Sequence, residues 1–149
     1  MNKINLQNLE LKIFTKQNAL DYCSINNINP DNIIELYLNN NELINISGIK
    51  LFKNLRTLDL ECNKLTDISI IKYFKNLIIL RLTDNEIKDI SAIQYLNSLI
   101  SLDIGYLELE SDQFKYIKEL KNLKELGCKK GFKDMSVINQ LNKNISLWT

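Results

Sequence analysis

An asparagine returns every 22 residues through the middle of the chain, and this spacing constrains the fold more than any other feature. Asn41, Asn63 and Asn85 each lie in the frame L-x-L-x-x-N-x-L/I. A fixed period of this length is typical of stacked, nearly identical units rather than of one globular core. The sequence therefore predicts a solenoid, in which each unit contacts only its neighbours.

Each 22-residue unit contains two different periodicities. The first part alternates apolar and polar residues, as in Leu58-Asp59-Leu60, which is typical of a short strand. The second part has an apolar residue at every third position, as in Leu65, Ile68 and Ile71. A step of three fits 3₁₀ turns, in which residues i and i+3 lie on the same side. Each coil is therefore predicted to contain a strand, a turn, a 3₁₀ segment and a return.

Alignment on the asparagines divides the chain into a cap and a repeat region. Residues 1–32 do not fit the repeat and form the cap, whereas 33–149 hold five units and a terminal partial unit. The units begin at Ile33, Leu55, Leu77, Leu99 and Leu123, and a sixth strand is predicted to begin at Ile145, with Trp148 at its core position.

The three repeated asparagines are interpreted as structural residues. The chain must turn inward after each strand, which leaves backbone donors and acceptors inside the coil. An asparagine amide offers two donors and one carbonyl acceptor. Asn41, Asn63 and Asn85 are therefore predicted to form an asparagine ladder that bonds the turns of adjacent coils.

The motif L-x-x-L-x-L-x-x-N-x-L-x-D-I-S, at residues 55–69 and with two isoleucines at 77–91, resembles the leucine-rich repeat family. The 22-residue length and the D-I-S segment are similar to the short repeats of bacterial internalins. The resemblance covers about residues 33–148. It implies an α/β right-handed solenoid with a parallel concave sheet of about six short strands, a mostly 3₁₀ convex side and an N-terminal helical cap. It also implies a protein-recognition scaffold.

The last third of the chain departs from this pattern. In unit four, Leu107 replaces the asparagine and two residues are inserted, and Ser111 as a helix N-cap predicts an α-helix over 111–120. In unit five one residue is missing and Lys130 takes the asparagine position. Degeneracy of a terminal repeat and a reshaped binding edge both explain these changes.

The first 32 residues are expected to cover the apolar end of the first coil, because the end coils of a solenoid need a cap. Thr15 precedes a predicted helix over 16–26, with Ala19, Leu20 and Cys23 on its inner face. The alternation of Leu9, Leu11 and Ile13 predicts a strand in the same segment.

Nothing in the sequence indicates an enzyme, a cofactor or a metal site. The chain has no histidine, no phosphate-binding glycine motif and no C-x-x-C pair. Asp59 and Asp103 occupy equivalent strand positions, but Arg81 should lie between them, so a solvated row of charges is expected. The net charge of +1 favours neither nucleic acid nor an anionic membrane as partner.

The cysteine content bears on the compartment. Cys23, Cys62 and Cys128 are odd in number and widely spaced, which favours reduced thiols. We therefore expect a cytoplasmic monomer, and a secreted protein is the alternative.

The outward strand positions define the predicted binding face. Its candidate residues on the concave side are Tyr37, Asp59, Glu61, Ile79, Arg81, Asp103 and Tyr106. Ile34, Ile78 and Ile100 add an apolar rim, which is either a protein-binding patch or an edge that loops or a flanking domain cover. The predicted function is that of a protein–protein interaction module, which binds a protein or peptide. The alternative is a structural spacer or a fragment of a larger multi-repeat protein.

Overall fold

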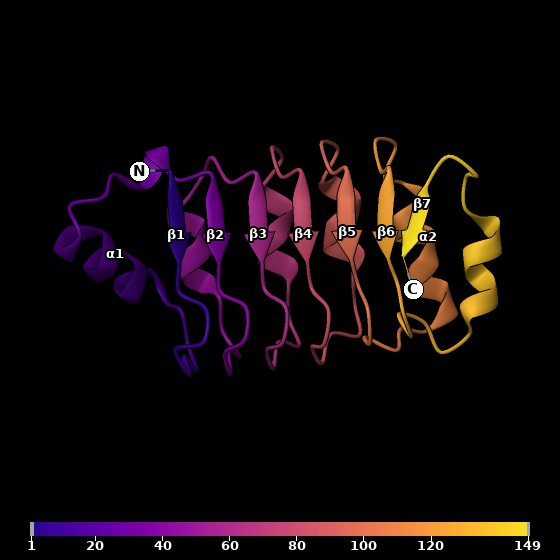
Figure 1. Cartoon of the computed structure of the whole chain (residues 1–149), viewed down its shortest axis with the longest axis horizontal. Helices are drawn as coiled ribbons and strands as arrows, with labels where there is room; N and C mark the ends of the chain where they lie inside the picture. The colour runs from indigo at the N-terminus through magenta and orange to yellow at the C-terminus, as the bar shows by residue number, and fades with distance from the viewer. Residues whose placement is uncertain (1, 149) are drawn as a thin grey trace.

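Seven short parallel strands form one sheet in the computed structural model, which describes residues 2–148 (Figure 1). The strands are β1 (Lys3–Asn5), β2 (Glu35–Tyr37), β3 (Thr57–Asp59), β4 (Ile79–Arg81), β5 (Ser101–Asp103), β6 (Glu125–Gly127) and β7 (Ser146–Trp148). Their order in the sheet is their order in the chain. Each coil of the chain therefore adds one strand beside the previous one.

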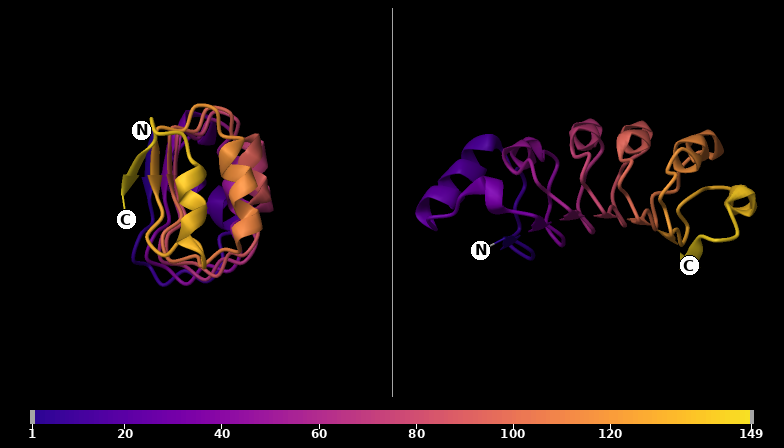
Figure 2. Two further views of the ribbon diagram at one scale, coloured as in Figure 1. Left: turned by 90° about the vertical axis from the view of Figure 1, so that its right-hand side faces the viewer. Right: turned by 90° about the horizontal axis from the view of Figure 1, so that it is seen from above.

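The opposite side of the solenoid consists mainly of 3₁₀ turns, as the three-residue period predicted. These are η2 (Ser47–Leu51), η3 (Ser69–Tyr73), η4 (Ser91–Tyr95), η5 (Ser111–Gln113) and η6 (Met135–Gln140), with η1 (Pro30–Asn32) before β2. The α-helices are α1 (Lys16–Ile25) and α2 (Phe114–Lys118). Seen from above, the row of turns and helices lies on the convex side and the strands lie on the concave side (Figure 2).

The core is built by rows of apolar side chains that stack from coil to coil. The central strand residues Leu36, Leu58, Leu80, Leu102 and Leu126 are in register and completely buried. Ile4 of β1 extends this row and is 1% exposed, whereas Leu147 of β7 extends it at the other end and is 44% exposed. Burial of each coil therefore depends on the next coil, as expected for a solenoid.

Each repeated asparagine bonds the backbone of its own coil and of the preceding coil. The Nδ2 of Asn63 donates to the carbonyls of Leu60 and Leu38, both at 3.0 Å, and its Oδ1 accepts from the N–H of Leu43 at 2.9 Å. Asn85 repeats this arrangement one coil later. Asn41 does the same toward the first coil, where its Oδ1 accepts from two N–H groups.

The residue before each ladder asparagine adopts a left-handed backbone conformation. Asn40, Cys62 and Asp84 have φ between 53° and 55°, and Tyr106 and Lys130 continue the series at 58° and 49°. Gly131 rather than Lys130 therefore takes the asparagine position of unit five, and that prediction is wrong. The left-handed conformation is uncommon for residues other than glycine, and asparagine and aspartate tolerate it best. The inward turn therefore requires the same backbone geometry even where the sequence supplies a cysteine, a tyrosine or a lysine.

The first coil lies closer to the repeat pattern than the sequence predicted. Its strand is Lys3–Asn5, which pairs in register with β2, so the sheet has a seventh strand. The predicted strand at Leu9, Leu11 and Ile13 is wrong, because only Ile13 pairs, in an isolated bridge to Asn45. The N–H groups of Leu9 and Leu11 instead bond the side chain of Asn41.

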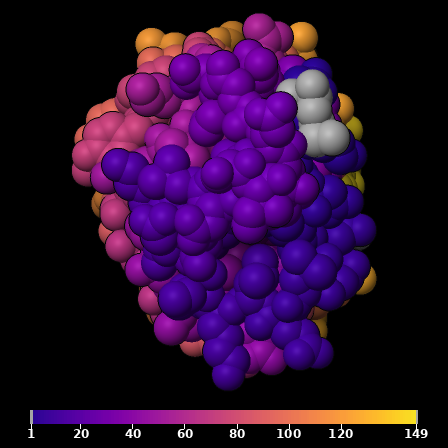
Figure 3. Space-filling view, turned by 90° about the vertical axis from the view of Figure 1, so that its left-hand side faces the viewer, coloured from indigo at the N-terminus to yellow at the C-terminus, as the bar shows by residue number. Residues whose placement is uncertain are grey.

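The predicted helix of the N-terminal segment is confirmed as α1. Thr15 is its N-cap and forms a capping box with Asn18. Ala19 and Cys23 are buried as expected, but Leu20 is 38% exposed and lies outside the inner face. This helix and the neighbouring loops cover the N-terminal end of the solenoid (Figure 3).

Gly48 allows the N-terminal segment to pack closely against the first full repeat. A Cβ atom at Gly48 would lie 2.3 Å from the carbonyl oxygen of Thr15 and 2.7 Å from that of Phe14. The N–H of Gly48 donates to the Phe14 carbonyl at 2.7 Å, and the Phe14 and Phe52 rings stack with centroids 6.3 Å apart. A larger residue at position 48 would therefore displace the segment that leads into α1.

The C-terminal third contains two differences from the sequence prediction. The α-helix of unit four covers only 114–118, and the Ser111 side chain makes no capping bond because Ser111 lies within the 3₁₀ turn η5. In β7, Leu147 rather than Trp148 pairs with Leu126. Unit five is one residue shorter than the alignment assumed, which places Trp148 on the concave side beside Gly127.

The ladder geometry makes a quantitative prediction for Asn63. Replacement by alanine leaves the Leu43 N–H and the two carbonyls without their side-chain partner. We expect Asn63→Ala to lower the free energy of unfolding by about 1–3 kcal/mol. Asn76→Ala, at an exposed position on the same solenoid, should change it by less than about 0.5 kcal/mol. Urea denaturation followed by circular dichroism measures both, and equal losses would contradict the role of the ladder.

Candidate functional site

The concave sheet presents rows of side chains that the parallel register aligns. One row contains Tyr37, Asp59, Arg81, Asp103, Gly127 and Trp148. A second row lies two residues further along each strand and contains Asn39, Glu61, Thr83, Gly105 and Lys129. The sheet therefore brings together five of the seven residues predicted to form the binding face, from four consecutive strands. Ile79 is half-buried in the row that begins each strand, and Tyr106 is exposed in the turn after β5.

The centre of this face is an ion pair between neighbouring strands. The Arg81 guanidinium lies 3.4 Å from Oδ2 of Asp59, and their side chains are 35% and 9% exposed. The other carboxylate oxygen, Oδ1, accepts a hydrogen bond from the Glu61 N–H at 3.2 Å. Arg81 pairs in register with both Asp59 and Asp103, so it separates the two aspartates as the sequence predicted.

Burial and repulsion raise the pKa values of two of these carboxyl groups. Desolvation is the largest cause of the raised pKa of Asp59, and Arg81 opposes it only in part. Desolvation also raises the pKa of Glu61, and the charges of Asp59, Asp103 and Asp84 add to the effect. The carboxylates of the concave face therefore lie close enough to repel one another, and Arg81 is the one cation that lowers both pKa values.

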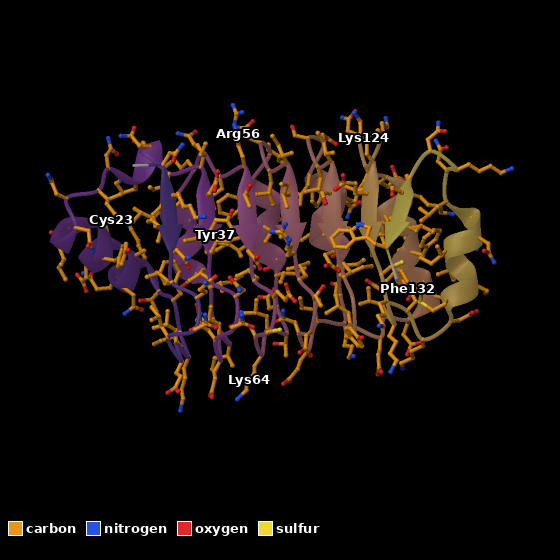
Figure 4. The ribbon with its side chains drawn as sticks, viewed as in Figure 1. Cys23, Tyr37, Arg56, Lys64, Lys124 and Phe132 are labelled. Atoms are coloured by element: carbon orange, nitrogen blue, oxygen red, sulfur yellow. The ribbon has the colours of Figure 1, made fainter. Side chains whose placement is uncertain are left out.

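Tyr37 lies at the N-terminal side of this group (Figure 4). Its hydroxyl donates to Oε2 of Glu35 at 3.1 Å, and the Lys3 ammonium lies 4.2 Å from the centre of its ring. The ring is half-buried, and burial is the largest cause of its raised pKa. Tyr37 thus offers an aromatic surface whose hydroxyl is already bonded.

The edge of the sheet where the strands begin is both apolar and basic. Ile34, Ile78 and Ile100 are half-buried at this edge. Arg56 lies between Ile34 and Ile78 in the same row, and Lys124 follows Ile100. The two basic side chains extend away from the sheet in Figure 4, while Lys64 extends from the opposite edge. The isoleucine rim is therefore narrow and interrupted by charges.

Two glycines leave a gap in the concave face that sequence reasoning missed. Gly105 and Gly127 occupy outward positions on adjacent coils, and the pocket there has a volume of about 190 Å³. Asp103, Thr83, Tyr106, Lys129 and Trp148 line it, and Cys128 lies buried below. The signal in the sequence was a glycine at both positions where the other coils carry side chains.

The convex side carries positive charge, opposite to that of the concave face. The net charge of the chain did not indicate this separation. The segments 47–54, 69–76 and 91–98 contain four lysines and no carboxylate. Lys50 and Lys72 lie 5.1 and 5.3 Å from the centre of the Tyr73 ring, and Lys75 lies 4.8 Å from that of Tyr95. The solenoid therefore has an acidic concave face and, over these three segments, a basic, tyrosine-bearing convex face.

Other kinds of site find no support within residues 2–148. No group of three or more His, Cys, Asp or Glu side chains could hold a metal ion there. None of the helices in this range combines the length and the apolar character needed to cross a bilayer. The three cysteines are free thiols, and burial is the largest cause of the raised pKa of each.

Comparison with solved structures supports the repeat architecture. An internalin from Listeria monocytogenes (inlF) superposes with a TM-score of 0.78 at 24% identity, covering 99% of this chain and 40% of that protein. A leucine-rich repeat protein from Leptospira interrogans gives 0.70 at 25% identity, covering 100% and 42%. Internalin C2 of L. monocytogenes gives 0.61 at 19% identity, covering 99% and 80%. The chain thus spans about two fifths of the length of the first two proteins.

Sequence comparison gives the same assignment. No curated protein sequence matches the chain. Family models described as leucine-rich repeats match residues 31–73 and 53–109. Those ranges contain the three ladder asparagines and the four strands from β2 to β5. The chain belongs to the leucine-rich repeat family.

Proposed function

We propose that the concave sheet binds a protein or peptide segment rich in basic residues. The observation that carries this proposal is the group of carboxylates on the sheet, of which Asp59 and Glu61 have raised pKa values that Arg81 lowers only in part. Leucine-rich repeat proteins typically serve as protein-interaction modules. Their curved sheets present an extended surface, and its outward residues do not take part in the core.

The raised pKa values of Asp59 and Glu61 support this proposal because they indicate that ionising these carboxyl groups costs free energy in the unbound protein. Each ionised carboxylate is less stable in the folded chain than in water, since burial and like charges both oppose ionisation. Groups with perturbed pKa values are candidates for functional sites. A cationic partner would stabilise the ionised forms and remove part of this cost.

The face supports binding rather than catalysis. It contains no histidine, and Cys62, the half-buried thiol next to it, has a pKa raised to about 11 by burial first and then by the charges of Glu61 and Asp84. Such a thiol stays protonated near neutral pH and is a poor nucleophile. We therefore propose a non-enzymatic monomer, and the three free thiols favour a reducing, cytoplasmic compartment.

The cost of ionisation at Asp59 can be measured directly. A carboxyl group whose pKa is raised on folding lowers stability at pH values above its folded pKa, and this penalty disappears as the pH falls below the unfolded pKa. Asparagine keeps the acceptor for the Glu61 N–H but carries no charge. We expect Asp59→Asn to be as stable as the wild-type protein or more stable at pH 7. Its relative advantage should shrink as the pH falls toward 4.

Denaturant titrations of both proteins at several pH values test this expectation. Asp67→Asn is a matched control, because Asp67 is exposed and its Oδ1 also accepts a backbone N–H, that of Ser69, at 2.7 Å. A clear loss of stability in Asp59→Asn at pH 7 would show that the ion pair with Arg81 outweighs desolvation. The carboxylate of Asp59 would then contribute to the stability of the fold, and its presence would need no binding partner as an explanation.

The binding face itself is tested by a charge swap that leaves the net charge unchanged. In Glu61→Lys/Arg81→Glu, two side chains of the concave face exchange their charges. We expect this variant to lose at least 90% of the partner that the immobilised wild-type protein captures from lysate of its host. Mass spectrometry identifies the captured protein, and isothermal titration with that purified protein gives the affinity.

The matched control is Glu42→Lys/Lys64→Glu, which reverses an exposed ion pair of 3.2 Å outside the two concave rows. A photo-crosslinking residue at Tyr37 should label the partner, whereas the same residue at Tyr73 on the convex side should not. Equal capture by both swap variants, or labelling from Tyr73 alone, would place the partner elsewhere. Thermal unfolding of each variant separates loss of binding from loss of folding.

A further inference from the structure

The pocket at Gly105 and Gly127 is part of the concave face but differs from it in construction. On four successive coils one row of this face contains the side chains of Tyr37, Asp59, Arg81 and Asp103. The next residue in the row is Gly127, which has no side chain. Trp148 of β7 closes the row on the far side. The result is a hollow of about 190 Å³ with an acidic wall on one side and an aromatic wall on the other.

The Asp103 carboxylate, which forms the acidic wall, lies at the edge of the space that the two glycines leave. A Cβ atom at Gly127 would lie 2.6 Å from Oδ1 of Asp103, so the carboxylate occupies the edge of the place where a side chain would project. Oδ1 accepts a hydrogen bond from the Gly105 N–H at 3.1 Å, which fixes the orientation of the group. Asp103 forms no salt bridge with any residue in the range 2–148.

A buried hydroxyl beside the carboxylate also lacks a partner. Oγ1 of Thr83 is inaccessible to solvent and forms no hydrogen bond within the described part of the chain. It lies 3.3 Å from the position of a Cβ atom at Gly105, so it borders the same hollow. Buried polar atoms without partners are uncommon in folded proteins, which sets this side of the hollow apart from the rest of the sheet.

The remaining wall suits a flat cation. Tyr106 and Trp148 are 43% and 44% exposed. The Lys130 ammonium lies 5.8 Å from the centre of the Tyr106 ring, so the Trp148 ring is the more available of the two to a cationic ligand. Aromatic rings attract cations over their faces, and a guanidinium group stacks on them while it donates to a carboxylate. Its N–H donors can form two parallel hydrogen bonds with the Asp103 carboxylate. Lys129 on the rim is the one cation that opposes this occupant among the lining residues.

We propose that this pocket receives a single arginine side chain of the partner. The assignment rests on the proposed function, because it names the anchoring residue of the peptide that the concave face binds. Asp103 accepts the guanidinium donors, and Trp148 and Tyr106 provide aromatic surface beside it. The surrounding carboxylates, Asp59, Glu61 and Asp84, strengthen the negative potential that attracts it.

The sole tryptophan of the chain gives a direct test. Trp148 lies in the pocket, so the single indole N–H signal in a ¹⁵N-correlated NMR spectrum reports on occupancy. N-acetyl-arginine amide is the probe, and N-acetyl-citrulline amide is its neutral analogue of nearly the same shape. We expect a saturable shift of the indole signal with arginine, with a dissociation constant in the millimolar range, and at least fivefold weaker binding of citrulline.

Variants distinguish the pocket from general attraction to an acidic protein. Asp103→Asn keeps the acceptor for the Gly105 N–H and should weaken arginine binding at least fivefold. Glu86→Gln removes the same charge at an exposed residue outside the pocket and should change it less than twofold. Lys129→Gln should strengthen binding two- to fivefold.

The outcomes also separate this inference from the proposed function. Equal shifts with arginine and citrulline, a shift that never saturates, or equal weakening by Asp103→Asn and Glu86→Gln would overturn the arginine pocket. If partner capture still depends on Glu61 and Arg81 in that case, the concave face binds without this anchor. If capture also persists in the charge-swap variant, both proposals are wrong.

Discussion

The contact between one coil and the next is the interaction on which the whole structure depends. Leu58, Leu80 and Leu102 are completely buried only because a neighbouring coil lies on each side, and Leu147 shows the alternative, since no described coil covers it beyond β7. The asparagine ladder adds a polar connection to this apolar one. Each amide bonds backbone groups of two successive coils, so it fixes their relative position and satisfies the inward turn at the same time.

Because the core and the ladder hold the coils together, the outward strand positions are less constrained than the inward ones. The core needs a leucine at the centre of each strand, but it places no demand on the residues on either side. Asp59 shows how far this freedom extends, because its carboxylate is nearly buried and has a raised pKa, a cost that an uncharged residue would avoid. The separation of charge between the acidic sheet and the basic turns is possible for the same reason, and a net charge of +1 does not reveal it.

The sequence predicted the features that repeat and failed where a single coil departs from the average. The strands, the 3₁₀ turns and the coil spacing follow from residues such as Leu60 and Ile68 that recur with a fixed period. The strand of the first coil was missed because Lys3–Asn5 has no ladder asparagine after it, and the amide of Asn41 serves that turn instead. The pocket was missed because it is defined by absent side chains at Gly105 and Gly127, and the register error at Trp148 hid its second wall.

Gly48 has a consequence for how arrays of this kind change in length. The segment from Phe14 to Thr15 can lie only against a coil with no side chain at that position, and the equivalent residues of the next two coils are Ile70 and Ala92. If an internal coil were duplicated or lost, the segment from Phe14 to Thr15 would therefore still pack against the coil that contains Gly48. The number of coils can therefore change without disturbing the contact between the N-terminal segment and the coil that contains Gly48.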